Sequence, residues 1–173
     1  MRVLHRHNQK FEIIRFSVLL FFFLVLVIPI NAYSYILTEE DKSQVLSGNI
    51  VIKEAENKDG VPGLVAAFSV NANLKDIWSV FVDYENFTKV FSNVKRLKVL
   101  EQDEEGAVVE FWVNAVVSDL NYVLYRKYDI PYRKLTWVRK SGDLKLIDGS
   151  WEIVDIPNEN KKMVIYRFFV DIG

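Results

Sequence analysis

The feature that most limits the fold of this chain is a run of apolar, alternating segments between Val94 and Asp171, each separated from the next by a short turn. The predicted strands are Val94–Gln102, Ala107–Val117, Asn121–Ile130, Arg133–Lys140, Ser150–Ile156 and Lys162–Asp171. Turn-forming residues such as Gly, Pro, Asn and Asp lie between them. Because short loops join antiparallel neighbours, the run predicts an antiparallel meander.

Helical patterns come before this run. Asn73 is a good N-cap, and apolar residues from Leu74 to Val82 recur at helical spacing. Asp83 is expected to cap a second short helix that ends near Phe91. A buried strand is predicted at Leu64–Val70, an edge strand at 50–52 and a helical turn at 38–46. Helices and strands are therefore segregated, which predicts an α+β fold with about six to seven strands.

Alternation along the strands places most aromatic side chains on one face of the sheet. That face carries Val109, Phe111, Val113, Leu135, Trp137, Trp151, Ile153, Val164, Tyr166 and Phe168. The opposite face is mixed, and we expect solvent to cover it. The two helices are too short to cover the aromatic face, so we expect either a further helix or a cavity there.

The N-terminal residues have the pattern of an export signal. A basic stretch precedes the uncharged, apolar run at 16–30, and small residues follow at Ala32 and Ser34. We interpret residues 1–34 as a signal peptide cleaved after Ser34 or Ala32, with an uncleaved anchor as the alternative. The domain is then exported and is either periplasmic or secreted, or tethered to the membrane by residues 16–30.

Composition excludes several chemistries. The sequence contains no Cys, and both of its His residues, His5 and His7, lie in the leader. Disulfides, thiolate nucleophiles, His-based triads and His metal ligands are therefore not expected in the mature domain. The chain has 22 basic and 23 acidic residues, which argues against a nucleic-acid partner. We predict no cofactor and no metal.

The order of these elements resembles the helix-grip fold of the START/Bet v 1-like (SRPBCC) superfamily, in its polyketide cyclase/dehydrase and coenzyme Q-binding START-type branch. The resemblance is carried by Ser47–Ile52, Asn73–Tyr84, Ser141–Lys145 and the Gly149-Ser150-Trp151 segment. It implies a curved sheet around a long C-terminal helix, with a hydrophobic cavity between them. That helix would follow Gly173, so we expect a C-terminally incomplete domain at 62–173, after an extension at 35–61.

The aromatic face and the resemblance predict non-catalytic binding or carriage of a lipid, isoprenoid or quinone in the cell envelope. The alternatives are a cyclase- or aromatase-like enzyme and an interaction module of an envelope complex. Arg126 is the ambiguous residue, because it lies among alternating Tyr residues, yet we expect a surface arginine paired with an acid. The oligomeric state is left open. The pocket candidates are Trp78, Phe81, Phe87, Phe111, Val113, Tyr125, Arg126, Trp137, Trp151, Tyr166 and Phe168.

Overall fold

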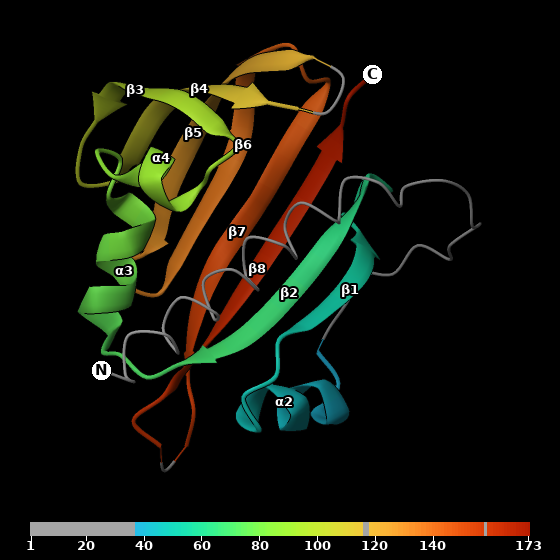
Figure 1. Cartoon of the computed structure of the whole chain (residues 1–173), viewed down its shortest axis with the longest axis vertical. Coiled ribbons are helices and arrows are strands. Elements are labelled where there is room, and N and C mark those ends of the chain that lie inside the picture. The colour runs from blue at the N-terminus through green and yellow to red at the C-terminus, as the bar shows by residue number, and fades with distance from the viewer. Residues whose placement is uncertain (1–36, 116–117, 158) are drawn as a thin grey trace, which may run out of the picture. The chain divides into compact units, whose positions relative to one another are not determined.

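One eight-stranded antiparallel sheet dominates the computed structural model of the chain, which describes residues 37–115, 118–157 and 159–173 (Figure 1). The strand order is β1-β2-β8-β7-β6-β5-β4-β3. The helices are α2 (Glu39–Leu46), α3 (Leu74–Val82) and α4 (Phe87–Val90). The strands are β1 (Val51–Glu56), β2 (Pro62–Val70), β3 (Val94–Gln102), β4 (Gly106–Asn114), β5 (Asp119–Ile130), β6 (Lys134–Gly142), β7 (Leu146–Asp155) and β8 (Lys162–Asp171).

The predicted α+β class and the meander are confirmed, because β3 to β8 pair in sequence order. The last strand of the meander also pairs with β2, so the segment that contains α3 and α4 joins β2 to the far edge of the sheet. This connection carries both helices across one face. The sheet has slightly more strands than the six to seven expected, since the segment at 50–52 is part of β1.

Some strand ends differ from the prediction. β7 begins at Leu146, four residues before the expected Ser150, because Leu146 and Ile147 pair with the end of β8. The strand expected to run to Val117 is described as far as Asn114 in β4. Residues 116 and 117 lie outside the described residues.

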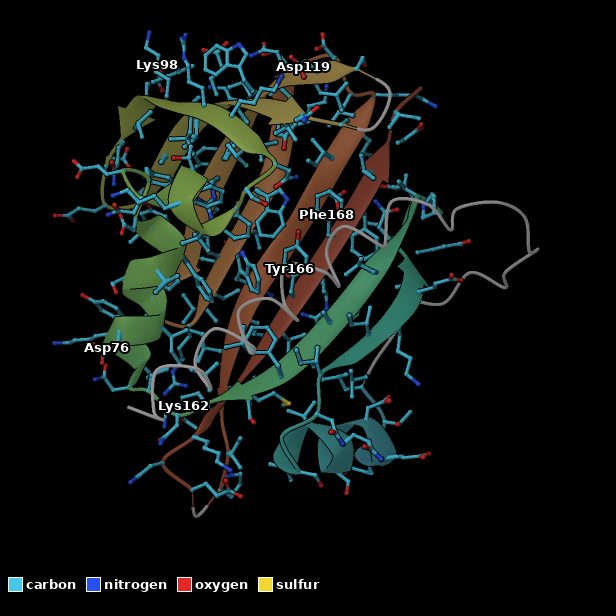
Figure 2. The ribbon with its side chains drawn as sticks, viewed as in Figure 1. Asp76, Lys98, Asp119, Lys162, Tyr166 and Phe168 are labelled. Carbon is cyan, nitrogen blue, oxygen red and sulfur yellow. The ribbon has the colours of Figure 1, made fainter. Side chains whose placement is uncertain are left out.

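The inner face of the sheet is the face toward α3 and α4. Ile77, Trp78 and Phe81 of α3 pack there against strand residues such as Val109 and Leu135. Eight strands about 4.8 Å apart span about 34 Å, whereas the nine residues of α3 span about 14 Å. Among the described residues, α3 and α4 therefore cover only part of this face, which leaves Tyr166 and Phe168 of β8 partly exposed (Figure 2).

The outer face is the opposite face, and the expectation that solvent covers it is wrong for one end of the sheet. Val45 of α2 packs there against Val65, Ala67, Ile165 and Phe169 of β2 and β8. Figure 1 shows α2 beside β1 and β2. β8 therefore carries apolar side chains on both faces. Those on the outer face belong to a second, smaller core that the alternation pattern of β8 does not predict.

A capping box starts α2, as the sequence predicts. The backbone N–H of Asp41 donates to Oγ1 of Thr38, and the backbone N–H of Thr38 donates to Oδ2 of Asp41, each at 3.1 Å. These bonds satisfy donors that a helix N-terminus leaves unpaired.

Replacing Thr38 with Ala is expected to lower the free energy of unfolding by about 1 kcal/mol, because Ala cannot accept the Asp41 N–H. Urea denaturation followed by circular dichroism measures the change. Thr38→Ser keeps the hydroxyl and should stay close to wild type. Equal stability of the Ala and Ser variants would refute the role of the cap.

Asp83 acts differently from the prediction. It is the C-cap of α3, and its carboxylate accepts from the backbone N–H of Asn86 at 3.2 Å. Asn86 is the N-cap of α4 and makes no side-chain cap hydrogen bond. Asp83 therefore closes the turn between the two helices, and this turn places Tyr84 against the sheet.

The predicted leader at 1–34 lies outside the described residues. Within 37–115, 118–157 and 159–173, no helix has both the length and the apolar character needed to cross a membrane. The boundaries proposed at residues 34 and 61 remain predictions.

Candidate ligand-binding site

Aromatic side chains form a continuous cluster on the inner face. The Phe81 ring of α3 stacks on Trp151 of β7 with centroids 4.9 Å apart, and Trp151 lies 4.2 Å from Tyr166 of β8. Tyr166 also contacts Trp137 of β6 at 5.8 Å and Phe168 at 6.0 Å. We call these five residues the aromatic cluster. Trp151, Tyr166 and Phe168 are only partly buried, so this part of the face can accept an apolar molecule.

The register of the strands explains why these residues meet. Trp151 pairs with Leu135 on one side and with Tyr166 on the other, so all three project from the inner face. Gly149 pairs with Trp137, and a Cβ on Gly149 would overlap the indole ring. The glycine therefore lets Trp137 lie flat across β7. This is the physical role of the Gly-x-Trp segment.

Arg126 of β5 lies next to this cluster and is the unusual group of the inner face. It pairs with Trp137 across β5 and β6, and only 3% of its surface is exposed. Its Cζ atom lies 5.1 Å from the Tyr84 ring centroid and 5.5 Å from that of Phe87. The expectation of a surface arginine paired with an acid is therefore wrong.

The guanidinium of Arg126 is incompletely satisfied. Among the described residues, Nη1 is fully buried and has no hydrogen-bond partner, and no carboxylate forms an ion pair with it. Burial lowers the pKa of Arg126, and the neighbouring tyrosines, Tyr84 first, partly offset this effect. Arginine remains charged in proteins despite such shifts, so the site holds a buried positive charge.

Tyr84, Tyr128 and Tyr166 act electrostatically on this charge. The hydroxyl of Tyr84 lies 3.1 Å from the hydroxyl of Tyr128, in hydrogen-bonding distance. Burial raises the pKa of Tyr122 to about 12 and also raises the pKa of Tyr128 and Tyr166. These phenols therefore stay protonated at neutral pH and can donate hydrogen bonds. We call Tyr84, Phe87, Arg126 and Tyr128 the arginine cluster.

The structure brings most of the predicted site residues to one face. Phe111 and Trp78 contact members of the arginine cluster: Phe111 lies 5.7 Å from Phe87, and Trp78 lies 5.5 Å from Tyr128, between ring centroids. Val113 is buried in the same core near the end of β4. Tyr125 does not belong with them, because it pairs with Val138 on the outer face, one residue out of phase with Arg126.

The ligand-pocket residues predicted from the sequence omit Tyr84 and Tyr128, although Tyr128 is a candidate acid or base for the enzyme alternative. Tyr128 was recoverable, because it lies two residues after Arg126 and so shares its face. Tyr84 follows Asp83, where the sequence pattern predicts only the beginning of a second short helix. Its contact with Tyr128 spans 44 residues of sequence, and local spacing carries no signal for it.

A separate surface depression of about 710 Å³ lies at the N-terminal end of α3. Its lining includes Asn73, Asp76, Asp155 and Lys162, and none of the predicted site residues. Figure 2 shows Asp76 and Lys162 at this end of the structure. Within the described parts of the chain, no group of three or more His, Cys, Asp or Glu residues is placed to hold a metal ion.

Comparisons with known proteins identify the architecture. A family model described as polyketide cyclase/dehydrase and lipid transport matches residues 70–172. A STAR-related lipid transfer protein from Xanthomonas axonopodis is similar in structure, with a TM-score of 0.58, 14% identity, and coverage of 70% of this chain and 76% of that one. The Zhui aromatase/cyclase from Streptomyces sp. R1128 gives a TM-score of 0.55 and 15% identity, and covers 72% and 70%.

A protein from Thermus thermophilus gives a TM-score of 0.58 at 14% identity, and covers 65% of this chain and 75% of that one. At these identities the neighbours establish the fold, which they share with this chain. No curated protein matches the sequence significantly.

Proposed function

The chain belongs to the polyketide cyclase/dehydrase and lipid transport family, and from this membership we propose that it binds and carries one apolar small molecule on the inner face of its sheet. The observation that carries the proposal is the aromatic cluster, whose residues Trp151, Tyr166 and Phe168 are only partly buried. Large apolar rings beside a few polar groups are the usual composition of such sites. A lipid, an isoprenoid or a quinone has the required chemistry.

The protonation of the tyrosines and Arg126 on the inner face favours ligand binding over catalysis. A general base must be able to take up a proton near neutral pH. The raised pKa of Tyr122, Tyr128 and Tyr166 keeps these phenols protonated, and Arg126 keeps its charge. They therefore serve as hydrogen-bond donors to a bound molecule. With the export signal predicted at 1–34, we place this carriage in the cell envelope.

The test uses tryptophan fluorescence with ω-bromoundecanol, a neutral chain whose bromine quenches only indoles that it contacts. Trp137 and Trp151 lie on the inner face, whereas Trp112 lies on the outer face beneath Arg96. We expect saturable quenching in the wild type. Saturable quenching should be smaller in Trp151→Phe, which lacks one indole of the inner face. In Trp112→Phe the quenching that comes from the inner-face indoles should be unchanged.

A second variant tests the binding surface directly. Phe168→Glu places a charge on the partly exposed inner face and should weaken binding of the alcohol by at least about tenfold. Val138→Glu is the matched control, because Val138 is 51% exposed on the outer face. Absence of saturable quenching, or equal losses in both variants, would refute binding at the inner face.

A further inference from the structure

The arginine cluster carries a charge that the described protein leaves unbalanced. Arg126 is nine-tenths buried or more, its Nη1 has no partner among the described residues, and its surroundings are rings and neutral hydroxyls. Burial of an unpaired charge is costly, and buried charges are normally paired and hydrogen-bonded. Nothing in the packing of β5 requires a charge at this position, because the partners of Arg126 on the adjacent strands are Ala107 and Trp137.

The hydroxyls beside Arg126 add a second donor. In the pair formed by Tyr84 and Tyr128, one O–H donates to the other oxygen. Arg126 and Gln102 also form hydrogen bonds with Tyr84 and Tyr128, respectively, and the second O–H of the pair can donate to a ligand. A guanidinium nitrogen and a phenolic O–H are thus available together. An acceptor with two oxygens and a single negative charge satisfies both donors and balances the one positive charge.

From these contacts we propose that the ligand is an amphiphile with a carboxylate, and that this carboxylate binds Nη1 of Arg126 and the tyrosine pair while the apolar tail lies along the aromatic cluster. The strand register supports a tail that runs from Arg126 to the aromatic cluster, because Arg126 pairs with Trp137 and Trp137 contacts Tyr166. The inference rests on the proposed function, and it replaces the neutral quinone or isoprenoid with a monocarboxylic acid.

Entry of the carboxylate requires movement of the residues that cover Arg126. Phe87 lies over the guanidinium and belongs to α4, which has four residues and no side-chain cap hydrogen bond. So short a helix has little stability of its own. Displacement of Phe87 and α4 breaks the ring contacts of Phe87 with Phe91 and Phe111 and uncovers one side of the guanidinium, and the main sheet need not change.

The experiment compares ω-bromoundecanoate with ω-bromoundecanol, which have the same chain and differ in the charged end. In the wild type at neutral pH, the acid should bind about 10- to 100-fold more tightly than the alcohol, as expected for a hydrogen bond to a charged group. Arg126→Met keeps an unbranched apolar stem and removes the guanidinium and its charge. In this variant the preference for the acid should disappear, while binding of the alcohol persists.

Lys127→Met is the matched control, because it removes one positive charge from the neighbouring, exposed residue on the other face of β5. It should retain the full preference for the acid. Equal affinity of the acid and the alcohol in the wild type, which needs no variant to fold, would overturn the inference but leave the proposed function standing. A preference retained in Arg126→Met would also overturn the inference. Failure of both probes to bind would overturn both proposals.

Discussion

Replacing Leu135 with Ala is expected to lower the free energy of unfolding by about 3 kcal/mol. Leu135 lies in β6 on the inner face, pairs with Trp151, and has no exposed surface. Truncation removes buried methyl groups and leaves a cavity that the surrounding strands cannot close, because they are held by the hydrogen bonds of the sheet. The loss should appear as a lower urea midpoint with an unchanged m-value.

The matched control for Leu135 lies on the same strand. Val138 of β6 is 51% exposed, so Val138→Ala should change the free energy of unfolding by less than about 1 kcal/mol. If both variants lowered the free energy of unfolding by a similar amount, the inner face of β6 would not be the centre of the core. If β6 is the centre, Leu135→Ala should also weaken binding of the neutral alcohol, since Leu135 supports Trp151.

Replacing Gly149 with Ala is expected to lower the free energy of unfolding by about 2–3 kcal/mol. The new Cβ would overlap the backbone carbonyl of Arg167 and would lie 2.8 Å from Cε2 of Trp137. One contact is with the neighbouring strand and the other with the flat indole, so both β8 and Trp137 must shift. Near-ultraviolet circular dichroism should report the displaced indole.

A double variant separates the two contacts of Gly149. In a Trp137→Leu background the indole is absent, and only the overlap with the carbonyl of Arg167 remains. The cost of Gly149→Ala should therefore be smaller there than in the wild type. An equal cost in both backgrounds would contradict the proposed role of Gly149 in seating Trp137.

Much of the fold could be predicted because it depends on local patterns. The turns after Gln102 and Ile156 separate apolar runs, and the alternation of Val164, Tyr166 and Phe168 places them on one face. These features involve neighbours in sequence, where the period of the strand is decisive. The same reasoning applies to Thr38 and Asn73, whose side chains cap α2 and α3 as expected.

The candidate site was only partly predictable. Alternation indicates that Trp137, Trp151 and Tyr166 share a face, but Tyr125 was included with Arg126 although adjacent residues of a strand point in opposite directions. The cover on the outer face was also missed, because Ile165 and Phe169 become buried only when α2 packs on β2 and β8. Because α2 is mostly polar, its sequence does not predict that it packs on β2 and β8.

The sequence alone determined the order of the strands and helices, the caps of α2 and α3, and the aromatic character of the inner face, because these follow from spacing within single segments. Only the tertiary structure decided that Arg126 is buried without an acidic partner among the described residues. Its burial depends on Tyr84 and Phe87, which lie about 40 residues earlier and reach it through the turn that Asp83 closes. An arginine is buried without an acid only where separate segments enclose it, and no local pattern records that enclosure.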